Sequence, residues 1–274
     1  MKSLLLSKIA NAKLSDYPFP HLIINDFLPL HVFRELESIL ELRTSEFHGS
    51  DVSSNKLILS SVFGPAGALK SDLSNQTSAD VRQALSLFTS KEVWFTILKI
   101  FNVAPRHDWS LSWRGLASNE GSIAPGLEYC YEVQFGFNTP VTRGASRVRG
   151  IHVDHPQKLF NGLIYFRSST DDCSGGDLGL YRFRSVPKLY YVNALDLDCE
   201  LVKVIPYQSN ALVIMKNSSE SLHGVIERPV CPHYRKYINI NLSVSEEVFQ
   251  LDKYQASKFR HEYVYSRYLL HSFP

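Results

Sequence analysis

Apolar side chains in the first hundred residues recur mainly at helical spacing. Between Leu30 and Leu42 they return every three or four positions, which predicts an amphipathic helix. Two further helices are expected over 79–88 and 93–101. Ser78 is placed to cap the first, and Thr89 opens a capping-box spacing before the second.

From about residue 109 the period changes to that of strands. Short alternating or β-branched runs are separated by Gly, Pro, Asn and Ser, the pattern of a sandwich or barrel built from two sheets. The first two of these runs are compatible with a meander. The strands expected are 109–116, 127–137, 150–155, 159–166, 178–183, 189–192, 201–205, 211–215, 223–226 and 237–245, preceded by a strand at 21–25 and a short strand-like run at 56–62.

The length of 274 residues fits one domain of this kind with helical additions. We expect a single domain over 1–274, with a helix-rich support (1–105), a β core (106–246) and a C-terminal helix (247–274). That last helix is expected to rest on the core or on another subunit, so the oligomeric state stays open. The polar stretch 44–76 has two interpretations, a mobile segment over a pocket and an ordinary surface loop.

Charge argues against nucleic acid as a partner. The 29 Lys and Arg residues nearly balance the 27 Asp and Glu residues, and the net charge is only +2. A local exception is the group Arg143, Arg147 and Arg149, for which a solvated loop is the favoured interpretation and contact with an anionic substrate the alternative.

The four cysteines lack a CxxC pair, so neither a zinc ribbon nor a redox motif is indicated, and free thiols are expected rather than a disulfide framework. The first residues contain too short an apolar run for a secretory signal. No stretch reaches the roughly 18 to 20 apolar residues of a membrane helix. We therefore expect a cytoplasmic protein with no membrane partner.

The strongest chemical signal is the stretch GIHVDHPQKLFNGLIY. If its first residues are extended, His152 and Asp154 project from the same face, because alternate residues of a strand share a side. His223, far downstream, would complete two imidazoles and one carboxylate. That set suits a divalent iron and leaves coordination positions open on the opposite side.

Several stretches, in this order, resemble the Fe(II)/2-oxoglutarate-dependent oxygenase superfamily, in particular its prolyl-4-hydroxylase-like members. They run from about Pro18 to Ser245, and their order is more specific than any one of them. The stretches are PFPHLIINDFL, HVDHPQKLFNGLIYF, GGDLGLY, NALVIMKNSSESLHGV and YRKYINI.

The resemblance implies a mainly β fold with flanking helices around a double-stranded β-helix core, of the jelly-roll or cupin-like kind. It implies Fe(II) held by His152, Asp154 and His223, with 2-oxoglutarate and O2 as co-substrates. It also implies that a basic residue about a dozen positions after the distal histidine holds the far carboxylate of 2-oxoglutarate, and Arg235 fits that position.

The residues around Arg235 support it on physical grounds. A guanidinium pairs with a carboxylate through two parallel hydrogen bonds and stays charged when buried. In an extended strand Arg235 and Tyr237 share the polar face, where Tyr237 would add a hydroxyl donor, whereas the rival cation Lys236 falls on the apolar face. Family members often place a tyrosine at the position of Tyr131 against 2-oxoglutarate, but a buried core tyrosine is an equally good interpretation.

Two residues beside the motif are candidates for substrate contact, His155 and Arg149. Because Asp154 is present, the chain lacks the substitution that makes room for halide in halogenating relatives, and hydroxylation of an unactivated C–H is favoured. The substrate class is a small molecule or a peptide. The alternatives are a catalytically silent binding protein of the same fold and a cupin-type metal enzyme that is not an oxygenase.

Overall fold

The computed structural model describes residues 1–45, 56–63, 69–105, 111–113 and 129–251. The architecture is mainly β with flanking helices, as the sequence predicts. Most of the expected C-terminal helix, and parts of the stretch 44–76, lie outside the described residues.

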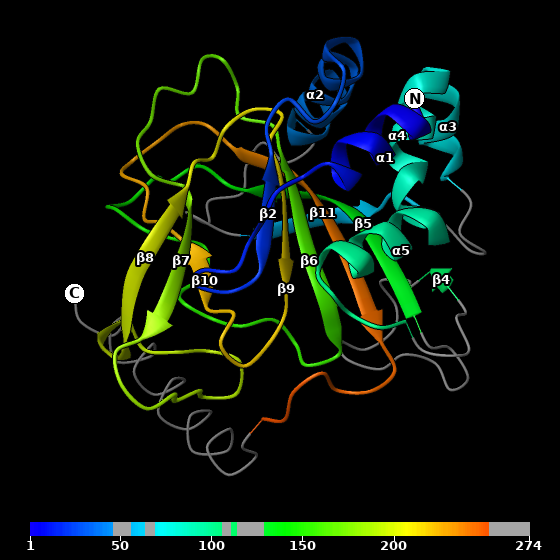
Figure 1. The fold of residues 1–274 in the computed structure, drawn as a ribbon. Helices are drawn as coiled ribbons and strands as arrows, with labels where there is room; N and C mark the ends of the chain where they lie inside the picture. Colours follow the sequence, from blue (N-terminus) through cyan, green and yellow to red (C-terminus); the bar gives the residue numbers. More distant parts are fainter. Residues whose placement is uncertain (46–55, 64–68, 106–110, 114–128, 252–274) are drawn as a thin grey trace.

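The helices come from the first hundred residues and cover one face of a large sheet (Figure 1). The three helices predicted from apolar spacing form α2, α4 continued by a 3₁₀ turn, and α5. Two others, α1 and α3, were not predicted. Their bounds are α1 Lys2–Ala10, α2 Leu30–Ser45, α3 Ser71–Gln76, α4 Ala79–Leu85, η2 Ser86–Thr89 and α5 Lys91–Ile100.

The capping prediction was right for α4 and wrong by one residue for α5. The Ser78 hydroxyl accepts a hydrogen bond from the Val81 amide at 3.2 Å. For α5 the cap is Ser90, whose hydroxyl accepts from the Val93 amide at 3.5 Å, and not Thr89. Thr89 belongs to the preceding 3₁₀ turn, so the box spacing is a coincidence of sequence.

The large sheet has eight strands in the order β1-β2-β9-β6-β11-β5-β3, with β4 also paired to β5. The β4–β5 pair is parallel, so the meander expected at this point is wrong, and every other pair is antiparallel. The bounds are β1 Leu14–Ser15, β2 His21–Ile24, β3 Lys56–Ser61, β4 Leu111–Trp113, β5 Tyr129–Asn138, β6 Lys158–Tyr165, β9 Leu212–Lys216 and β11 Arg235–Val244.

The small sheet has the order β10-β7-β8 and stands on the side of the large sheet away from the helices (Figure 1). Its strands are β7 Leu178–Phe183, β8 Cys199–Ile205 and β10 His223–Val225, and a 3₁₀ turn, η3 Asp196–Asp198, leads into β8. The strands expected at 150–155 and 189–192 do not form. Instead, His152 makes isolated bridges to His223 and Asn193. The chain therefore alternates between the sheets: β5, the His152 bridge, β6, then β7 and β8, and then β9, β10 and β11.

The register of β11 gives the large sheet two different faces. Arg235 pairs with Asn138 of β5, and Tyr237 pairs with Tyr165 of β6. The residues of β5, β6 and β11 that face the helices belong to one hydrophobic cluster with α1, α2, α4 and α5. The alternate residues face the small sheet, and many of them are polar.

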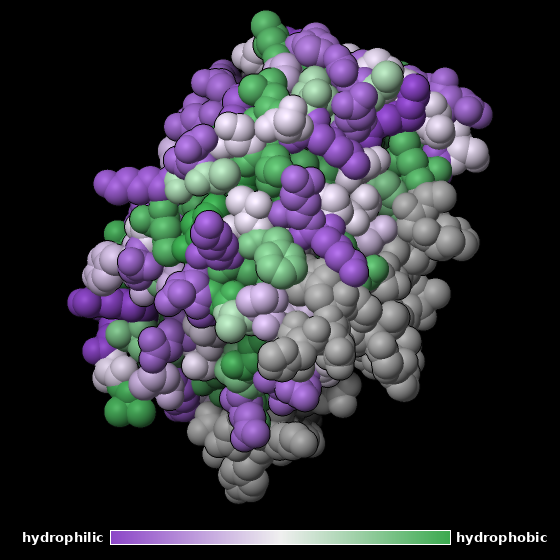
Figure 2. Space-filling model, turned by 45° about the vertical axis from the view of Figure 1, so that its right-hand side comes forward, coloured by the Kyte–Doolittle hydropathy of each residue, from purple (hydrophilic) through white to green (hydrophobic). Residues whose placement is uncertain are grey.

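The surface seen in Figure 2 shows hydrophilic side chains mixed with small hydrophobic areas. No helix in the described part of the chain is both long enough and apolar enough to span a bilayer.

Candidate metal centre and co-substrate pocket

Backbone pairing brings two distant histidines together. The amide of His152 donates to the carbonyl of His223, and the amide of His223 donates back, each at 2.9 Å. Asp154 lies two residues after His152 in the chain. One ligand atom from each of the three side chains lies within 4.8 Å of the other two, and all three residues are at most 6% exposed.

Both imidazoles are oriented by backbone carbonyls. The Nδ1 of His152 lies 2.8 Å from the Gly150 carbonyl, and the Nδ1 of His223 lies 2.9 Å from the Ser221 carbonyl. A carbonyl only accepts, so Nδ1 carries the proton and Nε2 presents a lone pair. The Nε2 of His223 lies 3.8 Å from an oxygen of Asp154.

The two histidines are in the neutral protonation state that binds a metal cation. Burial, which disfavours the charged form, lowers the pKa of His223 and lowers that of His152 well below its usual range. Both rings are therefore neutral at physiological pH, as metal binding requires.

The carboxylate of Asp154 is held ionised by its neighbours. Burial alone would raise its pKa, but Lys158, together with the two histidines and Arg149, holds that pKa well below the usual range. The Nζ of Lys158 lies 3.4 Å from Oδ1, and Asn161 donates to Oδ2. Two neutral imidazoles and one ionised carboxylate, with their ligand atoms close together in a buried site, form a donor set that fits Fe(II).

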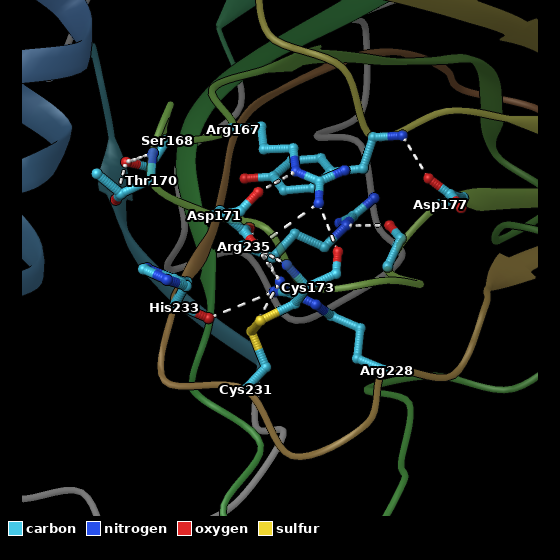
Figure 3. Close-up of polar contacts among 12 residues, drawn as sticks. Arg167, Ser168, Thr170, Asp171, Cys173, Asp177, Arg228, Cys231, His233 and Arg235 are labelled. Atoms are coloured by element: carbon cyan, nitrogen blue, oxygen red, sulfur yellow. Dashed lines mark hydrogen bonds and ion pairs between the residues drawn. A yellow bond between two sulfur atoms is a disulfide. The ribbon is translucent and has the colours of Figure 1, made fainter.

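Arg235 lies in the same pocket, at the start of β11. Figure 3 shows the residues around it. Its Nε donates to the Gly176 carbonyl at 2.6 Å, and its Nη1 donates to the amide oxygen of Asn138 at 3.2 Å. Both partners are neutral acceptors. Nη2 and the nearby hydroxyl of Tyr165 are buried and make no hydrogen bond of good geometry with the described residues, although the Arg235 side chain lowers the pKa of Tyr165 against the effect of burial.

Aromatic rings surround the guanidinium of Arg235 on several sides. Its central carbon lies 4.9 Å from the ring centroid of Tyr165, 5.0 Å from that of Tyr207 and 5.4 Å from that of Tyr237. Burial raises the pKa of all three phenols, so each keeps its proton. A buried cation with a free N–H, beside a hydroxyl that can donate, is suited to bind a carboxylate.

The loop beneath Arg235 is tied to the chain before β11. Glycine is required at Gly175, where φ is +72° and a Cβ would lie 2.0 Å from the Glu227 carbonyl oxygen. The Nη2 of Arg228 bridges both oxygens of Asp171 at 2.8 and 2.9 Å. These contacts hold Gly176 where its carbonyl meets Arg235.

A disulfide between Cys173 and Cys231 closes the same junction (Figure 3). The expectation that all four cysteines are free thiols is therefore wrong for this pair, whose separation of 58 residues gives no sequence signal. Cys130 and Cys199 are free and buried. Because disulfides persist mainly in oxidising compartments, the pair weighs against the cytoplasmic location, which stays a prediction.

The other predicted site residues divide between the pocket and its surroundings. Arg149 and Tyr237 line the pocket with Arg235. Tyr131 does not line it: it belongs to the hydrophobic cluster under the helices, with its ring 6.0 Å from that of Phe63. This is the core position that the sequence left open.

Two neighbours of predicted residues also lie outside the pocket. His155 is not among the lining residues, and its carbonyl accepts from Asn217. Lys236 points to the helix side, where it pairs with Glu41 of α2, so it cannot replace Arg235 as an anchor inside the pocket.

Several residues that shape the pocket were not predicted. Asn217 donates to the carbonyls of Asp154, His155 and Lys158, and so fixes the turn that carries the carboxylate. Asn161 lies in β6, and the alternation of side chains along this strand could have predicted that it faces the pocket. Others are Lys158, Asn138, Tyr165 and Tyr207.

Comparison with solved structures identifies the fold. The alignment with a prolyl 4-hydroxylase from Phytophthora capsici covers 95% of this chain and 73% of the hydroxylase chain, at a TM-score of 0.51 and 14% sequence identity. At this identity the likeness establishes a prolyl-4-hydroxylase fold and nothing finer.

Weaker likenesses, with TM-scores below 0.5, carry no argument of their own. One is to a prolyl-4-hydroxylase from Pseudomonas putida (TM-score 0.45, 13% identity, 90% of this chain and 100% of that one). Another is to a prolyl hydroxylase from Trichoplax adhaerens in complex with a hypoxia inducible factor peptide fragment (TM-score 0.43, 13% identity, 94% and 91%). No protein-family model matches the sequence, and the search of curated proteins found no match.

Proposed function

We propose that the protein is an Fe(II)- and 2-oxoglutarate-dependent oxygenase that hydroxylates an unactivated C–H of a small metabolite or peptide. The observation that carries this proposal is the pairing, in one pocket, of a buried His-Asp-His set with a buried arginine that no described acid neutralises. A silent binding protein would have no need of both.

The alternation of the chain between the two sheets supports a double-stranded β-helix core within a single oxygenase domain. In that arrangement the two sheets face each other across a second hydrophobic cluster and the polar pocket, and His152 and His223, joined by their backbone bridge, line that pocket. The metal ligands then come from the small-sheet side, while Arg235 comes from the large sheet.

In this proposal His152, Asp154 and His223 hold Fe(II). The bound metal, with 2-oxoglutarate and O2, supplies the oxidising power: one oxygen atom enters the substrate as a hydroxyl, and the other leaves in succinate as CO2 is released. Carbonyl contacts fix both imidazoles, and Asn161 orients the carboxylate.

Arg235 would bind the far carboxylate of 2-oxoglutarate through its unpartnered Nη2, with Tyr165 donating a second hydrogen bond. Tyr237 closes one side of this position as a ring against the guanidinium. These residues orient the co-substrate and exclude water, which limits oxidation of the protein itself.

The test is anaerobic titration of the Fe(II)-loaded protein with 2-oxoglutarate, followed by the visible metal-to-ligand charge-transfer band. We expect the band in the wild type and its loss when Asp154→Ala is combined with His223→Ala. In Arg235→Gln the co-substrate dissociation constant should rise by about 10- to 100-fold, since one charge-assisted contact is lost.

Lys236→Gln is the matched control, because it removes the adjacent cation on the opposite face of β11. It should leave the co-substrate affinity unchanged. Absence of the band in the wild type would contradict the proposed function. Equal changes of the co-substrate dissociation constant in Arg235→Gln and Lys236→Gln would contradict only the role of Arg235.

A further inference from the structure

Two cations, one on each side of Asp154 in the sequence, reach the metal site. Arg149 comes from the segment before the His152 bridge, and Lys158 is the first residue of β6. Their nitrogens lie 3.9 and 3.4 Å from the same oxygen, Oδ1 of Asp154. The side chains are 37% and 23% exposed, so a molecule entering from solvent can reach both.

The pocket carries more positive than negative charge. Asp154 is the only acid among its described lining residues, whereas Arg149, Lys158 and Arg235 are all cationic. Neutralisation of Asp154 does not account for this set, because a metal bound to that carboxylate would add two further positive charges. An unbalanced set of charges at a partly buried site is costly unless a counter-charge is bound there.

The co-substrate does not remove this imbalance at the Lys158 end. In the antiparallel pair of β6 and β11, Lys158 lies opposite Ser243, whereas Arg235 lies at the other end of β11 opposite Asn138. The far carboxylate of 2-oxoglutarate would therefore be held away from the start of β6, and the two negative charges of the whole co-substrate would only offset the two positive charges of the metal. The position between Arg149 and Lys158 remains for another anion.

We propose that Arg149 and Lys158 bind a carboxylate or phosphate group of the substrate and thereby select an anionic substrate. This inference rests on the proposed function, and it narrows the substrate class. Arg149 supplies a planar pair of donors and Lys158 a mobile point charge. The anion is either part of a free small molecule or the terminal carboxylate of a peptide.

Calorimetric titration of the anaerobic Fe(II) and 2-oxoglutarate complex tests the site without turnover. The small probes are hexanoate, its neutral counterpart hexanamide, and inorganic phosphate. The peptide probes are acetyl-pentaglycine with a free or an amidated C-terminus. We expect saturable binding of at least one anionic probe. The neutral counterpart of hexanoate or of the free-acid peptide should bind at least tenfold more weakly than the anion; phosphate has no neutral counterpart in the set. Preference for hexanoate or phosphate indicates a free small molecule, and preference for the free-acid peptide indicates a peptide terminus.

Arg149→Gln and Lys158→Gln should each weaken binding of the anionic probe at least tenfold, and by more than they weaken binding of 2-oxoglutarate. Arg184→Gln is the matched control, because Arg184 is an exposed cation of the small-sheet side that does not line the pocket. Equal binding of charged and neutral probes, no binding of any anionic probe, or a loss of probe affinity in the two variants no larger than their loss of 2-oxoglutarate affinity would overturn the inference. The charge-transfer band reports whether the Fe(II) and 2-oxoglutarate complex forms, and calorimetry reports whether the anionic probe then binds. A wild type that shows the band but binds no anionic probe would contradict this inference alone.

Discussion

The two faces of the large sheet divide stability from chemistry, and β11 shows the division residue by residue. Ile238, Ile240 and Leu242 face the helices and belong to the main hydrophobic cluster. Asn239 and Asn241 face the small sheet, where their amide groups donate to Gln134 and Glu132 of β5. One strand therefore supports a dry core and a polar pocket through its alternation alone.

The same contrast applies to adjacent cations. Arg235 faces the pocket with neutral hydrogen-bond partners, whereas Lys236 faces α2 and pairs with a glutamate. The charge of Lys236 on the helix side is therefore satisfied within the fold, while the charge of Arg235 on the pocket side remains available to a ligand. Changes on the two faces should consequently affect different properties.

The largest effect on stability is expected on the helix side. Phe160 is fully buried, and its ring lies 5.0 Å from that of Phe101. Phe160→Ala should lower the free energy of unfolding by about 3–5 kcal/mol, because it leaves a cavity in the core. Urea denaturation measures this loss, and Phe160→Leu should retain most of the stability. If Phe160→Ala instead abolished 2-oxoglutarate binding in protein that is still folded, the division between the faces would fail.

The next effect concerns the covalent link on the pocket side. Cys173→Ser removes the disulfide that ties the loop under Arg235 to the chain before β11. We expect a loss of about 2–4 kcal/mol in the free energy of unfolding, since the unfolded chain is no longer constrained. A thiol reductant should destabilise the wild type similarly and leave the variant unchanged.

Cys199→Ser supplies the control for this experiment, because Cys199 is a buried free thiol. Its stability should still fall on addition of reductant. A wild type that is insensitive to reductant and equal in stability to Cys173→Ser would mean that the bridge is absent in solution, which would restore the expectation of free thiols.

Local sequence patterns predicted most of the strands, the three longer helical stretches and the inward face of β11. Each of these depends on the period of apolar residues within one segment. The same alternation brought Arg235 and Tyr237 to the pocket and sent Lys236 to the helices. The order of the motifs also predicted the grouping of His152, Asp154 and His223.

Features that depend on contacts between distant segments were not predictable in this way. The pairing of Cys173 with Cys231 follows from how two loops meet in space. The segment at His152 forms a bridge rather than a strand for the same reason, because its partners His223 and Asn193 lie far along the chain. Tyr131 shows the limit of analogy, since its position on β5 directs it into the core.

The smallest predicted effect concerns a polar residue that joins the two sheets. His21 of β2 is buried, with its Nδ1 2.8 Å from the Phe19 carbonyl and its Nε2 2.8 Å from the Nζ of Lys203 on β8. The carbonyl accepts from Nδ1–H, so Nε2 accepts from the ammonium and the ring is neutral. Burial, opposed by the Phe19 carbonyl and reinforced by Lys203, lowers the pKa of His21 below 6.5.

The sign of the pH dependence follows from that lowered pKa. Below about pH 6.5 the unfolded chain binds a proton at this histidine more readily than the folded protein does, so the free energy of unfolding falls as pH falls. One such group contributes at most about 1.4 kcal/mol per pH unit. Urea denaturation of the wild type and His21→Gln between pH 5 and 8 isolates the contribution of His21 to the pH dependence of stability, because His152 and His223 are present in both proteins. We expect the difference in stability between the two to shrink as the pH falls below 6.5. Parallel curves would show that His21 is not held neutral, and that this part of the pocket-side face tolerates charge as the helix side does at Lys236.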